Sequence, residues 1–355
     1  MSLFVDIKKK LKGFSLEVSF ETNGDYLGIL GASGSGKSMT LKCIAGIETP
    51  DEGIIVLNGK VLFDSKKNIN LKPQERNVGY LFQNYALFPN MTVEENISIG
   101  LKSSKLEKNK KIAEIIKSFH LQGLEKKYPR QLSGGQQQRV AMARCIIYKP
   151  DILMLDEPFS ALDSYLKEKL QTEVLELLKY YNGEVLMVTH SRDEVYKFCK
   201  NISLIEKGKS ILLGDTKDIF KNPKLKEAAI LTGCKNISKC KIISKNKIHA
   251  VDWDTFLEVD SLVDENIKYV GIRAHDFKIV NENEVNNNEN IIECKIHKIV
   301  EEVFEYSIIF ENNNCNLKTS NDTILYKIKK EDWNNRNNKD KLFLKIPKES
   351  ILLLE

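Results

Sequence analysis

Two glycine-rich segments, about a hundred residues apart, constrain this chain of 355 residues more than any other feature. GASGSGKS occupies Gly31–Ser38, and LSGGQ occupies Leu132–Gln136. The first fits the pattern G-x-x-x-x-G-K-[ST] of a phosphate-binding loop, between an apolar run and a helical pattern as the motif requires. The second is a phosphate-binding loop that the chain's own nucleotide site cannot easily use. We therefore expect it to serve a second copy of the chain.

The first loop predicts a nucleotide site whose parts have defined roles. Its glycines let backbone N–H groups surround the phosphates, and the N-terminus of the following helix adds partial positive charge. We expect Lys37 to reach the β- and γ-phosphates and the hydroxyl of Ser38 to bind Mg²⁺. The predicted nucleotide-binding residues of this loop are Gly31, Ala32, Ser33, Gly34, Ser35, Gly36, Lys37 and Ser38.

The segment ILMLDEP at Ile152–Pro158 predicts the acidic part of the same site. A buried apolar strand that ends in Asp156 can hold Mg²⁺. Glu157, the next residue, is placed to orient or activate the attacking water. Without the phosphate loop, a strand end with an acidic helix cap would be the better interpretation.

Three further residues follow the order along the chain that such a site needs. Gln83, in GYLFQNY, is expected to contact both Mg²⁺ and a moving interface. His190 ends the run VLMVTH and is expected to sense the γ-phosphate, while Asp163, in SALD, is expected to bridge two subunits. Taken singly, each has an ordinary alternative: a turn glutamine, a core histidine and a helix cap.

The hydrophobic pattern predicts two kinds of domain. Apolar runs such as Tyr26–Leu30, Ile152–Asp156 and Val185–His190 alternate with helical patterns, which is typical of an α/β parallel sheet covered by helices. Asn58-Gly59 is the expected turn of a hairpin. After Thr232-Gly233 the pattern changes to short strand-like runs separated by asparagine clusters, which predicts a small all-β barrel domain.

Composition excludes other function classes. The net charge of +5, from 54 basic and 49 acidic residues, gives no indication of nucleic-acid binding. No run approaches the roughly 18 apolar residues that span a bilayer, and the apolar stretch in MSLFVDIKKK is shorter than we expect of a signal peptide. We expect a cytoplasmic chain whose membrane role, if it has one, depends on a partner.

The order of GASGSGKS, Gln83, LSGGQQQR, ILMLDEP, SALD and His190 closely resembles the ATPases of ATP-binding cassette (ABC) transporters, over roughly residues 1–230. The resemblance implies a P-loop cassette with a parallel-sheet core, an antiparallel β part and a helical subdomain. It implies two cassettes that sandwich two ATP molecules head to tail. Glu157 would be the catalytic carboxylate and His190 the switch histidine. The residues implied to contact the partner's ATP are Ser133, Gly134, Gly135 and Gln136.

The remainder of the chain resembles the tails of importer ATPases. The segment GIRAHDF at Gly271–Phe277 is similar to a motif of TOBE-type regulatory barrels, and Leu57–Ile97 is most similar to the molybdate and sulfate importers. The implied domains are residues 1–232 (cassette, helical subdomain about 88–147) and 233–355 (TOBE-type barrel, one or two tandem units). The implied partners are membrane permease subunits, docked near Phe82–Pro89 at the cytoplasmic face, and indirectly a solute-binding protein. The tail is a candidate oxyanion site, to which Lys and Arg residues such as Arg273 would contribute; the alternative is that Arg273 is a solvated surface arginine.

The sequence departs from the family at one place and leaves other functions open. Where the family has an aromatic residue that stacks on adenine, the chain reads IKKKLKGF, and its nearest aromatic, Phe14, is expected in a strand core. Sulfate, polyamine, sugar and metal remain alternative solutes to molybdate. A soluble ABC-type regulator and a DNA- or ribosome-associated ATPase are the alternatives of another class.

Overall fold

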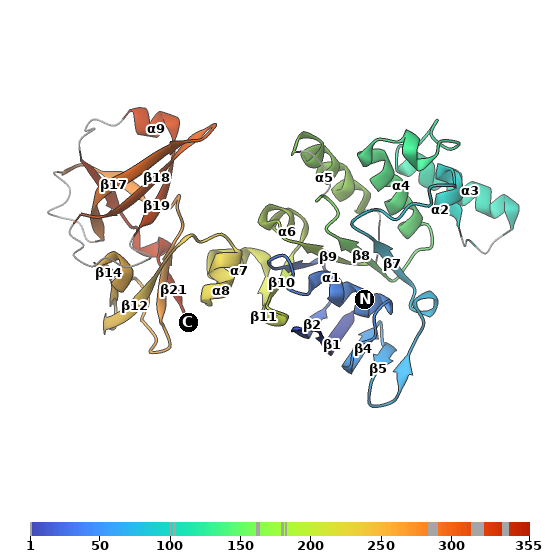
Figure 1. Ribbon diagram of the computed structural model, residues 1–355, viewed down its shortest axis with the longest axis horizontal. Helices are drawn as coiled ribbons and strands as arrows, with labels where there is room; N and C mark the ends of the chain where they lie inside the picture. The colour runs from blue at the N-terminus through green and yellow to red at the C-terminus, as the bar shows by residue number, and fades with distance from the viewer. Residues whose placement is uncertain are drawn as a thin grey trace. The chain divides into compact units, whose positions relative to one another are not determined.

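The structure is a computed structural model, and it describes residues 2–99, 101, 104–160, 164–178, 181, 183–282, 290–313, 323–335 and 341–355. The chain forms two compact units, Met1–Lys217 and Asp218–Glu355, which are called unit 1 and unit 2 below (Figure 1). The boundary after residue 232 and the tandem barrel units stay predictions. Among the described helices, none is long and apolar enough to cross a membrane.

Unit 1 is built on one large mixed sheet. Its described strands are β1 (Leu3–Leu11), β2 (Phe14–Thr22), β3 (Leu27–Leu30), β4 (Glu52–Leu57), β5 (Lys60–Asp64), β6 (Ile69–Asn70), β7 (Val78–Leu81), β8 (Ile152–Asp156), β9 (Glu184–Thr189), β10 (Asn201–Glu206) and β11 (Lys209–Asp215). Within the described residues the order is β6-β5-β4-β1-β2-β11-β10-β3-β9-β8-β7. Strands β10, β3, β9, β8 and β7 pair in parallel, and β6 to β2 pair antiparallel. The predicted parallel core and antiparallel part are confirmed.

The central strands of this sheet are apolar because both of their faces are covered. Every residue of β3, β8 and β9 is buried, as expected for parallel strands between two helix layers. The predicted hairpin joins β4 and β5, and its turn residues Asn58 and Gly59 have φ of 51° and 78°. The strands β3, β9, β8 and β7 run in the same direction, so the residues that follow them gather at one edge of the sheet.

The helices of unit 1 lie around this sheet. They are α1 (Lys37–Ala45), α2 (Val93–Ser98), α3 (Lys105–Ser118), α4 (Gly134–Ile146), α5 (Ser164–Leu178) and α6 (Arg192–Phe198), and α7 (Thr216–Lys221) spans the division between the units. Helices α2, α3 and α4 gather near β7 (Figure 1), which agrees with the expected helical part of the cassette. Helix α3 ends at Ser118, and His120 and Gly123, which follow it, adopt left-handed φ of 51° and 77°.

Unit 2 is an all-β unit with short helices, as the sequence predicts. Its described strands are β12 (Asn236–Ser244), β13 (Lys247–Ala250), β14 (Thr255–Glu258), β15 (Tyr269–Ile272), β16 (Lys278–Val280), β17 (Ile291–Glu301), β18 (Glu305–Asn312), β19 (Ile324–Lys329), β20 (Leu342–Lys345) and β21 (Leu352–Leu354), and its helices are α8 (Lys226–Leu231) and α9 (Lys330–Asn334). Among these residues there are two five-stranded sheets, β14-β13-β12-β15-β21 and β16-β20-β17-β18-β19, with antiparallel pairing. One hydrophobic cluster, which includes the fully buried Trp253, collects side chains from both sheets.

Arg273 of unit 2 has a structural role that the sequence did not indicate. Its guanidinium donates to the carbonyl oxygens of Thr232, at 2.8 Å, and of Phe220. It is therefore neither a solvated surface arginine nor free for an anion, since its hydrogen bonds fasten the helical segments before β12 to this unit.

Candidate functional site

The phosphate loop lies between β3 and α1, where the sequence placed it. Gly34 and Gly36 have φ of 78° and 103°, a region that glycine reaches without steric cost. Gly36 is the N-cap of α1 and offers no side chain to cap it, so the first backbone N–H groups of the helix are available to an anion. The ring of Phe14 packs beside Gly36 and against the core of the sheet, as expected for a strand residue.

Lys37 is folded back onto this loop. Only 4% of its surface is exposed, and its Nζ donates to the carbonyl oxygens of Gly31 and Ala32, both at 2.9 Å. Burial lowers the pKa of Lys37, and the nearby carboxylates of Glu157 and Asp156 partly offset this effect. A buried ammonium group held by two neutral carbonyls is a suitable partner for a phosphate, which would supply the missing opposite charge.

Ser38 and Asp156 form the second part of the site. The hydroxyl of Ser38 donates to Oδ1 of Asp156 at 2.7 Å, and the hydroxyl of Tyr80, in β7, donates to Oδ2 at 2.8 Å. Burial and the Asp156 carboxylate both raise the pKa of Tyr80, so this phenol stays a donor. In the described chain no three His, Cys, Asp or Glu residues cluster as metal ligands. The oxygens of Ser38 and Asp156 nevertheless fit Mg²⁺, which uses few protein ligands and completes its shell with water and phosphate.

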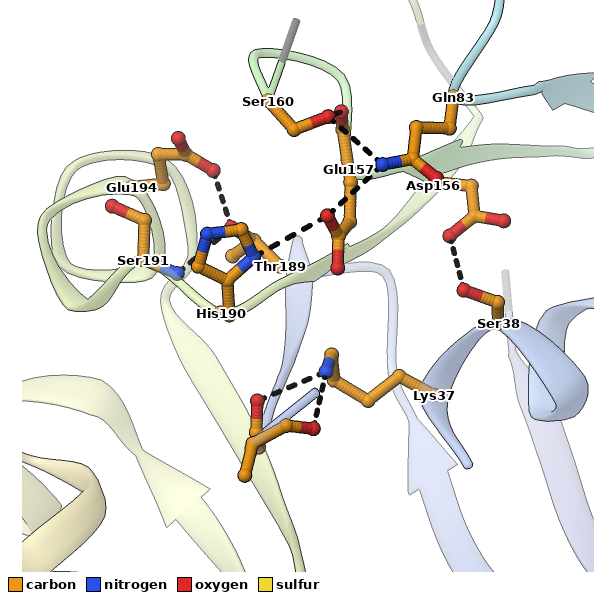
Figure 2. Close-up of polar contacts among 12 residues, drawn as sticks. Lys37, Ser38, Gln83, Asp156, Glu157, Ser160, Thr189, His190, Ser191 and Glu194 are labelled. Atoms are coloured by element: carbon orange, nitrogen blue, oxygen red, sulfur yellow. Dashed lines mark hydrogen bonds and ion pairs between the residues drawn. The ribbon is translucent and has the colours of Figure 1, made fainter. Parts of the chain in front are cut away.

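Glu157 follows β8 in an unusual backbone conformation. Its φ of 47° is left-handed, which is uncommon for a residue other than glycine, and its N–H donates to the carbonyl of Val188 at 2.9 Å. This conformation directs the carboxylate between two polar side chains, as Figure 2 shows. Oε2 of Glu157 lies 3.4 Å from Nε2 of Gln83 and 3.3 Å from Nδ1 of His190.

The turn after β9 holds His190 at this position. Glu194, on α6, is buried and accepts a hydrogen bond from the hydroxyl of Thr189, whose oxygen in turn accepts from the N–H of Ser191 at 3.0 Å. The ammonium group of Lys167 lies 2.6 Å from the same carboxylate. This network holds both neighbours of His190 in place. The imidazole itself is half-exposed to solvent and faces Glu157 (Figure 2).

The segment LSGGQ forms the start of α4. Ser133 is the N-cap: its Oγ accepts from the N–H of Gln136 at 3.3 Å, and its own N–H donates to Oε1 of Gln136 at 3.0 Å. Gly135 is buried against α5, where an added Cβ would lie 3.0 Å from Leu170. Ser133 and Gly134 are exposed. In the described part of the chain, no hydrogen bond links this segment to the phosphate loop.

The structure thus brings together most of the predicted residues from distant parts of the chain. Lys37, Ser38, Gln83, Asp156, Glu157 and His190 gather at the strand ends, and Ser133–Gln136 form a separate helix start. Asp163 lies outside the described residues.

Sequence reasoning missed Tyr80, Ser160 and Glu194. The hydroxyl of Ser160 lies 3.3 Å from Nε2 of Gln83. The place of Tyr80, three residues before Gln83 in a strand that leads to the site, was a usable signal. Ser160 is the first residue of the segment SALD, in which only Asp163 was given a role. Glu194 had no such signal, because folding alone brings it to its partners.

Comparison with known proteins places this geometry in a family. The family model described as ABC transporter matches residues 11–160. The molybdate/tungstate import ATP-binding protein WtpC of Pyrococcus horikoshii is 37% identical over 82% of this chain and 84% of its own length. This chain belongs to the ABC transporter family. It is an ATP-binding subunit of the importer type, an ATPase coupled to transport.

Other relatives of this ABC subunit differ in the solute that their names give. The spermidine/putrescine import ATP-binding protein PotA of Clostridioides difficile is also 37% identical, over 85% of this chain and 84% of its own length. A solved dimeric ATP-binding cassette bound to ADP and Pi, in a post-hydrolysis state, is 28% identical with a TM-score of 0.51. The match covers 61% of this chain and 99% of the chain in that structure. The names of the two import relatives thus share ATP binding and differ in the solute.

Proposed function

We propose that this subunit hydrolyses ATP at the strand-end site of unit 1 and thereby energises the import of molybdate. The observation that carries the ATPase is the Glu157 carboxylate, held between Gln83 and His190 beside the Ser38–Asp156 pair. A carboxylate in that position can orient and deprotonate a water that attacks the γ-phosphate.

The other residues divide the remaining work. The N–H groups of Gly31–Ser38 cradle the phosphates, and Lys37 exchanges its two carbonyl partners for phosphate oxygens. His190 donates to the γ-phosphate and, through its contact with Glu157, reports whether that phosphate is present. Ser38, Asp156 and Gln83 are the residues that would hold Mg²⁺. When bound, Mg²⁺ neutralises charge that develops on the β- and γ-phosphate oxygens.

A second copy of the chain completes each site in this proposal. Ser133 and Gly134 are exposed at a capped helix N-terminus, and no hydrogen bond among the described residues links Ser133–Gln136 to the phosphate loop of their own chain. They would contact the γ-phosphate held by a partner, and Asp163 would lie at the contact between copies. The dimeric cassette among the similar solved structures supports this arrangement.

ATP binding is then a switch between two populations. ATP closes the dimer, the closed dimer holds membrane permease subunits outward-facing, and hydrolysis releases them. In this proposal the subunit lies at the cytoplasmic face of the membrane, attached through the permease near Phe82–Pro89. A solute-binding protein delivers the solute to the permease and meets this subunit only indirectly.

Molybdate is the proposed solute, with sulfate and polyamines as the nearest alternatives. The names of molybdate/tungstate import relatives and the resemblance of Leu57–Ile97 support an oxyanion. The solute needs a direct test because a polyamine import relative is as similar to this chain, at 37% identity, as the molybdate/tungstate relative. In the same proposal unit 2 binds the oxyanion and restrains the transporter.

Calorimetry on the purified full chain tests the solute, with molybdate, tungstate, sulfate and spermidine as separate titrants. Micromolar binding of molybdate or tungstate that is lost when unit 2 is altered supports an oxyanion importer. Binding of spermidine alone would contradict molybdate and favour a polyamine importer. If none binds, the regulatory role of unit 2 is wrong, and uptake by the complex with its permease decides the solute.

Turnover separates the proposal from a nucleotide-gated regulator. An enzyme needs Glu157 and His190, whereas a sensor needs only nucleotide binding. Steady ATP hydrolysis by the chain in its assembled complex supports the enzyme. Nucleotide binding without hydrolysis there would contradict it.

A further inference from the structure

A buried glutamine connects the LSGGQ helix to the turn that carries Glu157. Gln138, on α4, is fully buried, and its Nε2 donates to the carbonyl oxygen of Pro158 at 3.1 Å. Its Oε1 is also buried and has no hydrogen-bond partner among the described residues. An unpaired buried acceptor costs stability, and this cost offsets part of what the single hydrogen bond to Pro158 contributes.

The turn that Gln138 contacts is held from several sides. The carbonyl of Glu157 accepts from the N–H and the hydroxyl of Ser160, at 3.2 and 2.9 Å. Gln83 contacts both Ser160 and the Glu157 carboxylate. Gln138 fixes the peptide between these residues. A shift of α4 therefore moves the backbone directly attached to Glu157.

The same helix also holds the loop that carries Gln83. The guanidinium of Arg144, near the end of α4, donates to the carbonyl oxygens of Tyr85 and Ala86, at 2.8 and 2.7 Å. Tyr85 and Ala86 have φ of 60° and 44°, so this loop is strained and depends on such contacts. Helix α4 thus controls the backbone on both sides of the Gln83–Glu157 contact.

We propose that Gln138 is a positioning residue that couples the two ATP sites of the dimer. This inference rests on the proposed function, in which Ser133–Gln136 at the start of α4 bind the partner's ATP. Binding there fixes α4, and the hydrogen bond from Gln138 to Pro158 transmits the new position to Glu157 of the same chain. Each Glu157 is then placed for hydrolysis only when the other site holds ATP.

The substitution Gln138→Met tests this coupling in the full chain, because methionine has a similar shape but no donor. We expect kcat for ATP hydrolysis to fall about tenfold, and the Hill coefficient for ATP to fall toward 1. The KM for ATP should change little. The melting temperature should fall only slightly, because the loss of the donor to the Pro158 carbonyl is partly offset by the removal of the unpaired Oε1. Gln171→Met is the matched control: Gln171 is a buried glutamine of α5 that bonds Lys197 and not the Glu157 turn, so its kcat should stay near the wild-type value.

Mixed dimers give the sharper result. When one copy carries Glu157→Gln, only the wild-type Glu157 of the other copy hydrolyses ATP. Gln138→Met in the copy with the intact Glu157 should lower the rate about tenfold. The same substitution in the Glu157→Gln copy should leave the rate within about twofold, although that copy supplies LSGGQ to the working site.

Other outcomes overturn the inference. A fall in melting temperature well beyond the loss of one hydrogen bond, together with a fall in kcat, would show a structural role. The rate of ATP hydrolysis could also fall as much, or more, when Gln138→Met is placed in the Glu157→Gln copy. That result would show that the substitution merely disturbs LSGGQ. An unchanged rate in both placements would show no coupling. If the wild-type dimer does not hydrolyse ATP at all, the proposed function itself fails, which is a distinct result.

Discussion

The buried polar side chains of the two units are arranged for different purposes. In unit 1 one group of them gathers at one edge of the sheet: Lys37, Asp156, Thr189 and Glu194 are all buried, and they lie around the Glu157 turn. In unit 2 most of the buried polar side chains instead bond to backbone groups, and Ser307, which donates to Glu302, is an exception.

Three asparagines show the second arrangement most clearly. Asn236 of β12 exchanges two hydrogen bonds of 2.8 Å with the backbone of Leu325 in β19. Asn290 makes the same exchange with Glu258 of β14, at 2.7 and 2.8 Å. Asn312 of β18 donates to the carbonyls of Trp253 and Asp254. Asn236 and Asn312 therefore tie the two sheets of unit 2 together, and Asn290 ties the segment before β17 to β14.

The difference indicates where chemistry and architecture reside. Polar groups that face each other with incomplete pairing can exchange partners with a ligand, as Lys37 can. Polar groups that satisfy strand backbone have no such freedom, and their loss costs stability instead. Substitutions in unit 1 should therefore change activity, and substitutions of the bridging asparagines should change stability.

The largest effect is expected from Lys37→Met. It removes the buried ammonium group that would meet the phosphates, so the affinity for ATP should fall about 10- to 100-fold. Fluorescent-nucleotide binding to the full chain measures this. Lys66→Met, at an exposed lysine in the turn after β5, is the control and should bind normally. Equal affinity in both variants would place the nucleotide elsewhere.

Asn236→Ala should affect stability and not hydrolysis. It leaves the N–H and carbonyl of Leu325 without their side-chain partner, which should cost about 2 kcal/mol of unfolding free energy. Both tryptophans, Trp253 and Trp333, belong to unit 2, so tryptophan fluorescence during urea unfolding follows that unit. Asn246→Ala is the control, at an exposed asparagine of a hairpin turn. It should change the unfolding free energy by less than about 0.5 kcal/mol. A loss of ATP hydrolysis with normal stability would reverse the comparison.

A smaller effect is expected from Tyr80→Phe. It removes the phenol that donates to Asp156, so the Mg²⁺ concentration needed for half-maximal hydrolysis should rise about three- to fivefold. Tyr181→Phe is a matched control, because the Tyr181 phenol donates to the carbonyl of Pro150 and not to the site. An identical Mg²⁺ dependence in all three proteins would exclude Asp156 as the Mg²⁺ ligand that Tyr80 supports.

The smallest effect concerns pH and the surface of unit 2. Hydrogen bonds from Ser307 and Lys327 lower the pKa of Glu302 to about 2. A lowered pKa stabilises the fold above the unfolded-state pKa of about 4.5, and this contribution disappears as the pH falls toward 2.

Glu302→Gln tests that contribution through urea midpoints, again followed by tryptophan fluorescence. The variant should be slightly less stable than the wild type at pH 7, and the difference should vanish near pH 2. Glu265→Gln, at an exposed glutamate, should show no such trend. A Glu302→Gln difference that is constant with pH would rule out the ionised carboxylate as its cause.

The phosphate loop, β8, β9 and the placement of Gln83 and His190 could be predicted because spacing and apolar runs encode them locally. The Glu157 turn could not be predicted in full, because its left-handed backbone depends on bonds from Ser160 and Gln138 that only the fold brings close. The asparagine-rich composition of the second half gave no functional signal. Asn312, in one of its clusters, nevertheless bridges two sheets. Such long-range pairing of side chain with backbone leaves no periodic trace in a sequence.

Phosphate release from Mg²⁺-ATP by the full chain with its partner subunits, compared between wild type and Glu157→Gln, tests the central claim most directly. The account predicts steady release by the wild type and a loss of at least about 100-fold in the variant, with ATP still bound. Equal release by both proteins would contradict it, because the carboxylate between Gln83 and His190 would then not be the group that acts on water.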